Sequence, residues 1–170
     1  MSNIVLGLDA STKVVGWALA ENKSIMDAGF LNISKFETNK EKGKFVVSFL
    51  SKHPLISSVH HINLEAALSG FGGGFTSQQT IITLSRWNAI LEYILSEFFT
   101  VPIILCNVNT VRKKVLGKAR IQGINSKEFV KMELIKKIFN LHQFEKLNKK
   151  GMFDKHNYDV YDAIIMSLYE

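Results

Sequence analysis

The stretch Ile4-Val5-Leu6-Gly7-Leu8-Asp9-Ala10-Ser11 is an apolar run that ends in a carboxylate and a small-residue turn. A short apolar run of this kind indicates a buried β-strand, and Ala10–Lys13 is typical of a tight turn. Two further strand patterns follow at Val14–Ala20 and Ile25–Ile33, so this part of the chain predicts a three-stranded antiparallel meander. Asp9 then ends the first strand, at the edge where ligands bind in open α/β sheets.

Beyond the meander, strand and helix patterns alternate along the chain. Apolar residues at a spacing near 3.6 predict helices, and short apolar runs bounded by turn residues predict strands. In chain order we expect a helix over 38–51, a strand over 59–64, a helix over 77–98, a strand over 102–106, a helix over 127–140 and a helix over 156–168. This order predicts an α/β fold, with a mixed five-stranded sheet and helices on both faces, in a single domain over residues 1–170.

Three more acidic residues stand at informative places. Glu65 ends the predicted strand 59–64, and Asp159 and Asp162 lie one turn apart in the last helix. Each has an ordinary explanation: Asp favours turns, Glu65 could be a surface residue, and an acid in a first turn suits the helix dipole. Taken together, four carboxylates from separate elements can converge on Mg²⁺ or Mn²⁺, and two such ions can clamp a phosphodiester. The pattern therefore predicts metal-dependent cleavage of phosphodiesters.

The charge balance points to a polyanionic partner. The chain has 21 Lys and Arg against 15 Asp and Glu, a formal net charge of +6, for which simple solubility is the alternative explanation. We expect basic side chains to contact nucleic-acid phosphates without reading bases, although solvated surface lysines would give the same pattern. The candidate residues are Lys13, Arg112, Lys113, Lys114, Lys118, Arg120, Lys146, Lys149 and Lys150.

These motifs resemble the RuvC-type Holliday-junction resolvases of the RNase H-like superfamily. The resemblance rests on Leu6–Ser11, Gly16-Trp17, Ile62–Glu65, Val108–Gly117 and Asp159–Ala163, and it covers nearly the whole chain. Phage-encoded members look like the nearest kin. The resemblance implies an RNase H-like fold and paired symmetric nicking of four-way DNA junctions by a homodimer that pairs through the helix 77–98.

The resemblance also implies roles for matched residues. Asp9, Glu65, Asp159 and Asp162 would bind Mg²⁺ or Mn²⁺, with two ions in each active site. Lys127 resembles a family lysine that acts at the scissile phosphate. The interval between Gly117 and Lys127 is longer than the family's, so Lys118 or Arg120 could take that role instead.

Two aromatic residues flank the glycines that follow Glu65. Phe71 and Phe75 could wedge between bases and stack at a junction centre, or they could fold back onto the core. The five histidines have no metal-ligand spacing. His156, three residues before Asp159, could approach the acids, but we do not count it among the candidate site residues.

The single cysteine, Cys106, lies in an apolar run and is expected to be a buried small side chain. One cysteine excludes an internal disulfide and fits a reducing compartment. We find no secretory signal and no apolar run long enough to span a membrane. We therefore expect a cytoplasmic protein with no membrane partner, acting in the bacterial host cell if it is phage-encoded.

Two alternatives to junction resolution stay open. The first is an RNase H-like nuclease that acts on other branched DNA, on flaps or on RNA–DNA hybrids. The second is a non-catalytic DNA-binding module of the same fold, against which the presence of all four acids argues. Comparing the cleavage of four-way, three-way, flap and hybrid substrates distinguishes junction resolution from the first alternative. An absence of Mg²⁺-dependent cleavage would favour the second.

Overall fold

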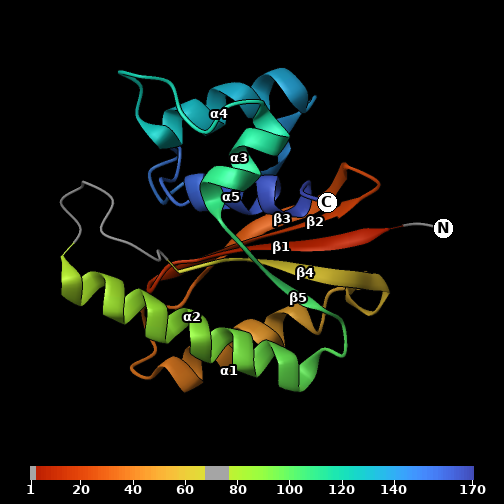
Figure 1. Cartoon of the computed structure of the whole chain (residues 1–170), viewed down its shortest axis with the longest axis vertical. Coiled ribbons are helices and arrows are strands. Elements are labelled where there is room, and N and C mark those ends of the chain that lie inside the picture. The colour runs from red at the N-terminus through yellow and green to blue at the C-terminus, as the bar shows by residue number, and fades with distance from the viewer. Residues whose placement is uncertain (1–2, 68–76) are drawn as a thin grey trace.

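The computed structural model describes residues 3–67 and 77–170, and its centre is a mixed five-stranded sheet (Figure 1). The strands are β1 Ile4–Ala10, β2 Val14–Glu21, β3 Ser24–Asn32, β4 Val59–Glu65 and β5 Ile103–Cys106. Their order across the sheet is β3-β2-β1-β4-β5, with β1–β2 and β2–β3 antiparallel and β1–β4 and β4–β5 parallel. The expected meander and mixed sheet are both confirmed.

Five α-helices connect or flank these strands in the described part of the chain. They are α1 Asn39–Leu50, α2 Gln78–Phe98, α3 Val108–Leu116, α4 Ser126–Lys137 and α5 Asn157–Ser167. Local chemistry sets their starts: Thr38 and Glu41 form a capping box on α1, and the Ser77 hydroxyl caps α2. Asn125 caps α4, which begins at Ser126, one residue before the expected start at residue 127.

The short helix α3 was not expected from the sequence. Asn107 caps it by accepting from the N–H groups of Asn109 and Thr110, and Gly117 ends it at φ 83°, a left-handed conformation that suits glycine. The basic residues in this segment obscured a short apolar face formed by Val111 and Leu116. The run Arg112-Lys113-Lys114 is therefore helical.

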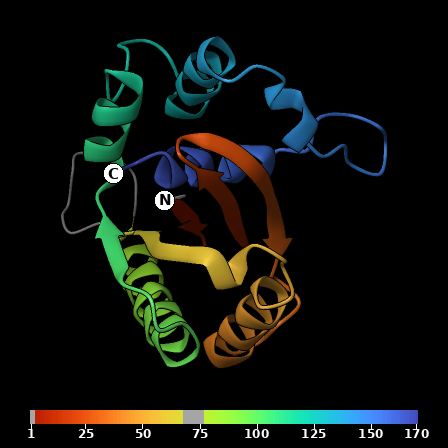
Figure 2. The same ribbon diagram turned by 90° about the vertical axis from the view of Figure 1, so that its right-hand side faces the viewer.

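The helices form layers on the two faces of the sheet, as expected. Figure 2 shows α1 and α2 next to each other below one face, and α5 against the other face with α3 and α4 outside it. Each face has its own apolar core: Trp87 and Leu91 of α2 pack in one, and Tyr161 and Ile165 of α5 pack in the other. The buried Cys106 belongs to the second core, as predicted.

Two glycines let α5 lie directly on the strands. A Cβ at Gly7 of β1 would come within 2.2 Å of the Ala163 carbonyl oxygen, and one at Gly16 of β2 would come within 2.0 Å of the Asp159 carbonyl oxygen. Such distances are far inside van der Waals contact, so only glycine fits at either position. The absence of side chains at Gly7 and Gly16 therefore lets the backbone of α5, which carries Asp159 and Asp162, contact the sheet directly.

Gly16→Ala is expected to destabilise the protein by about 1–3 kcal/mol, because the added methyl group must push α5 off β2. Urea denaturation at neutral pH measures this change. Ser24→Ala, at an exposed position at the start of β3, is a control that should leave stability near the wild-type value. Equal stability of Gly16→Ala and the wild type would contradict the close seating of α5.

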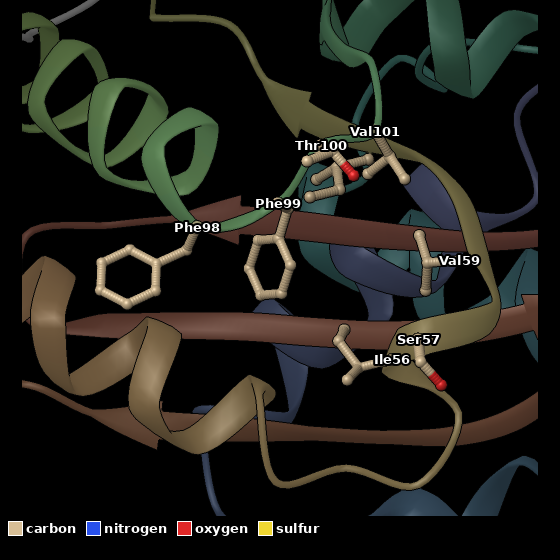
Figure 3. Close-up of a pocket in the computed structure, with 8 residues that line it drawn as sticks. Ile56, Ser57, Val59, Phe98, Phe99, Thr100 and Val101 are labelled. Atoms are coloured by element: carbon tan, nitrogen blue, oxygen red, sulfur yellow. The ribbon is translucent and has the colours of Figure 1, made fainter.

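A small pocket lies at the start of β4. Figure 3 shows Ile56, Val59, Phe98 and Phe99 around it, and its volume is about 130 Å³. It lies at the start of β4, whereas Glu65 lies at the end of that strand, so the pocket is remote from the acids.

Among the described residues, no helix is both long enough and apolar enough to cross a membrane.

Candidate active site

The strand ends bring Asp9 and Glu65 together. β1 and β4 are parallel neighbours with Leu8 opposite Leu64, so the next residue of each strand is an acid at the same edge of the sheet. Burial raises the pKa of Asp9 well above its ordinary value, and the adjacent Glu65 raises it further. Burial also raises the pKa of Glu65. The two carboxyl groups therefore lie close together in a buried setting that disfavours their charged forms.

The helix α5 supplies the other two acids. Asp159 and Asp162 are buried in its first two turns, where Gly7 and Gly16 hold the helix against the sheet. The charges of Asp162 and Asp159 contribute to the raised pKa of Asp9, which places all four carboxyl groups within electrostatic reach of one another. The four acids therefore influence one another, and their convergence on a single metal site stays a prediction.

Each acid of α5 has a basic partner. The Arg112 guanidinium donates to Asp162 at 2.8 Å, and both side chains are only 10% exposed. The Lys127 ammonium lies 3.3 Å from one carboxylate oxygen of Asp159, and the His156 ring lies 3.4 Å from the other. Burial raises the pKa of Asp162 even though Arg112 opposes that effect.

The donor set fits a divalent cation in its chemistry. Mg²⁺ and Mn²⁺ take oxygen ligands, and a cation beside Asp9 and Glu65 would favour the charged carboxylates that burial disfavours. As the side chains stand, residues 3–67 and 77–170 contain no group of three or more His, Cys, Asp or Glu arranged to hold a metal ion. Asp159 and Asp162 instead lie in ion pairs with Lys127 and Arg112.

Comparison with solved structures finds this architecture in Holliday junction resolvases. Thermus thermophilus RuvC matches with a TM-score of 0.61 and 15% identity, over 97% of this chain and 91% of that chain. T. thermophilus RuvC in complex with Holliday junction substrate matches with a TM-score of 0.63 and 16% identity, over 98% and 90%. The yeast mitochondrial Holliday junction resolvase Ydc2 matches with a TM-score of 0.61 and 15% identity, over 98% and 76%. The fold is RNase H-like and matches that of RuvC.

The likeness to RuvC at this identity concerns the fold alone, and it confirms the predicted fold class. No protein-family model matches the sequence, and no curated protein matches it. The roles of individual residues in the RuvC-like fold therefore depend on the geometry of this chain.

Lys127 contacts one of the candidate acids, whereas its two alternatives make no ion pair with them among the described residues. Its ammonium contacts Asp159 and is half exposed, so it can also reach a bound phosphate. Lys118 and Arg120 are exposed in the segment between α3 and α4 and make no ion pair with any described residue. The geometry favours Lys127 for the position beside the acids.

The other predicted DNA-contacting residues separate into two groups. Arg112 is buried against Asp162, so its side chain is not at the surface where phosphate contact was expected. The rest of the described candidates are exposed: Lys13, Lys113, Lys114, Lys118, Arg120, Lys146, Lys149 and Lys150. Phe71 and Phe75 lie outside the described residues.

Three residues of the site were missed by the sequence reasoning. Arg112 was placed on the surface, and His156 was left out of the candidate set, yet both contact an acid of α5. Asn88 of α2 donates to the carbonyl oxygen of Glu65 at 3.1 Å. A signal for Asn88 was present, because it is a polar residue beside the apolar Trp87 in a stretch that packs on the sheet.

Proposed function

We propose that this protein is a metal-dependent, structure-selective DNA endonuclease that resolves four-way junctions by paired symmetric nicks. The observation that carries the proposal is the meeting of four carboxyl groups, from β1, β4 and α5, at one edge of a RuvC-like sheet. Support for the substrate comes from the structural neighbour that is bound to a Holliday junction. The exposed basic residues of the described chain, among them Lys13, Lys149 and Lys150, suit a polyanion.

In this proposal Asp9, Glu65, Asp159 and Asp162 hold two Mg²⁺ or Mn²⁺ ions. When bound, the ions polarise the phosphodiester and lower the pKa of the attacking water. Lys127 neutralises charge on the phosphate, which it can reach because its side chain is half exposed beside Asp159. Water adds to phosphorus, one P–O ester bond breaks, and the leaving oxygen takes a proton.

The decisive experiment is cleavage of a synthetic four-way junction by the purified protein. We expect paired nicks at symmetry-related positions in Mg²⁺ or Mn²⁺ and none in EDTA. Three-way, flap and RNA–DNA hybrid substrates, assayed in parallel, should be cut more slowly. Faster cutting of flaps or hybrids would replace the proposal with the broader RNase H-like nuclease, and an absence of metal-dependent cutting of every substrate would refute nuclease activity.

One observation favours a second function, a non-catalytic DNA-binding module. Arg112 and Lys127 already neutralise Asp162 and Asp159, as basic residues would where no metal is used. A module of this kind would bind junctions equally well in EDTA and Mg²⁺ and would cut none. The raised pKa values of Asp9 and Glu65 argue against it, because no basic residue pairs with either acid among the described ion pairs.

A homodimer formed through α2 is part of the proposal, because a two-fold pair of sites suits a two-fold substrate. The outer face of α2 carries Tyr93, which is 63% exposed, beside a hollow of about 460 Å³ that also borders Ile103 of the edge strand β5. Large apolar residues at an exposed face of this kind are typical of interfaces.

Tyr93→Glu is expected to convert the dimer to a monomer, because each copy would bring an unpaired charge into the apolar interface. Sedimentation velocity measures the change in mass. Phe139→Glu is the matched control, since Phe139 is 91% exposed just beyond α4 on the other side of the sheet. A Tyr93→Glu protein that remained dimeric would exclude this face of α2 as the interface.

A further inference from the structure

Asn88 connects α2 to the strand end that carries Glu65. Its side chain is buried, at 8% exposure, and its amide nitrogen donates to the Glu65 carbonyl oxygen at 3.1 Å. The adjacent N–H of Ala66 donates to the Cys106 carbonyl oxygen at 2.8 Å. The peptide unit between Glu65 and Ala66 is therefore held by α2 through its carbonyl and by β5 through its N–H.

The orientation of this peptide unit determines the direction of the Glu65 side chain. β4 ends at Glu65, where β5 still pairs through Cys106 but the register with β1 ends at Leu64, so the sheet holds the backbone from one side only. A peptide that could rotate would turn the Cα–Cβ bond of Glu65 and move its carboxylate relative to Asp9. The bond from Asn88 removes that freedom.

Packing alone does not explain a buried amide at this place. The neighbouring Trp87 and Leu91 are part of the apolar core, where an apolar residue would avoid the cost of removing an amide from water. The side-chain oxygen of Asn88 is also buried and accepts no hydrogen bond within residues 3–67 and 77–170. An unpaired buried acceptor costs about 1–3 kcal/mol, so the amide is kept at a cost that the bond to Glu65 must offset.

We propose that Asn88 is a positioning residue that sets the Glu65 carboxylate for binding of a divalent metal ion. The inference rests on the proposed function only in taking Asp9 and Glu65 as metal ligands. Loss of a residue that orients a metal ligand weakens metal binding about tenfold or more. Asn88 does not reach the phosphate-binding surface, so DNA affinity should not depend on it.

The test is Mn²⁺ binding to the purified full chain, measured by isothermal titration calorimetry. Asn88→Leu keeps the side-chain volume and removes the donor, and Asn88→Ala provides a second variant should the first not fold. We expect Mn²⁺ affinity to fall about tenfold in either variant. Junction binding in EDTA should be unchanged. In cleavage assays the Mn²⁺ concentration that gives half-maximal rate should rise, while the KM for the junction stays constant.

Ser167→Ala is the matched control. It also removes one buried hydrogen bond, from the Ser167 hydroxyl to the Ile164 carbonyl oxygen, but at the far end of α5 from the acids. We expect it to keep wild-type Mn²⁺ affinity, so that a general loss of stability is separated from a loss of positioning.

The outcomes for Asn88 and for the nuclease proposal are distinguishable. A folded Asn88 variant with wild-type Mn²⁺ affinity overturns the positioning role, whether or not the wild type cuts junctions. Weakened Mn²⁺ binding in the variants supports the positioning role even if the wild type cuts no junction, and only the nuclease proposal then fails. A wild-type protein that binds no Mn²⁺ overturns both.

Discussion

Asp9→Asn is expected to abolish cleavage of a four-way junction while leaving junction binding intact. The charges of the other three acids all act on Asp9, and its loss removes one of the four proposed metal ligands. We expect the rate in Mg²⁺ to fall by about a thousandfold or more, equivalent to about 4 kcal/mol of transition-state stabilisation. Single-turnover cleavage and a gel-shift assay in EDTA measure the two quantities. Full nicking by a folded Asp9→Asn protein would refute the role of Asp9.

The same substitution is expected to raise the thermal stability of the metal-free protein. The pKa of Asp9 is raised in the folded state, so the unfolded chain releases this proton at a lower pH. The stability contributed by protonated Asp9 is complete below the ordinary pKa of 3.8 and is lost as the pH rises through the raised value. The amide of the Asp9→Asn variant does not ionise, so the variant avoids this loss.

Differential scanning calorimetry in EDTA at several pH values tests this expectation. The Tm advantage of Asp9→Asn should grow as the pH rises from acidic to neutral, and Mn²⁺ should stabilise the wild type but not the variant. Exposed Glu37→Gln removes the same formal charge and should give no such advantage. A variant less stable than the wild type at neutral pH would show that Asp9 makes a compensating contact in the fold.

Much of the fold was predictable because strands and helices that pack on the sheet repeat their apolar residues at a regular spacing. Leu6 and Leu8 alternate with residues that face α5, and the long apolar face of α2 has a clear helical period. The helix α3 was missed because a nine-residue element has too few turns for its period to stand out among basic residues. The shift of one residue at the start of α4 reflects the equal ability of Asn125 and Ser126 to cap a helix.

The site was predictable only at the level of its acids. Positions at strand ends and in a helix turn identified Asp9, Glu65, Asp159 and Asp162. The neighbouring sequence does not show which basic residues pair with them, because those partners come from distant parts of the chain. In a run of three basic residues, the side chain that turns inward is decided by the seating of α3 against α5, a tertiary contact. The run therefore predicted a surface, whereas Arg112 lies inside and only Lys113 and Lys114 are exposed.

Arg112→Leu is expected to destabilise the metal-free protein by about 3 kcal/mol at neutral pH, because it leaves the buried Asp162 carboxylate without its partner. Urea denaturation in EDTA measures the loss. Lowering the pH should shrink the deficit, since burial already raises the pKa of Asp162 and the loss of Arg112 removes an opposing effect, so that the carboxyl takes up a proton. Exposed Lys113→Leu, the adjacent residue on α3, should cost little.

A double-mutant cycle separates the ion pair from packing. Combining Arg112→Leu with Asp162→Asn removes both charges, so the double variant should recover most of the stability that either single variant loses. A double variant as unstable as the sum of the single changes would show that Arg112 acts through its packing and not through its charge. Mn²⁺ adds a further distinction: if the ion pair holds Asp162 until a metal replaces it, Mn²⁺ should stabilise Arg112→Leu more than the wild type. Equal stabilisation would mean that Arg112 and the metal do not compete for Asp162.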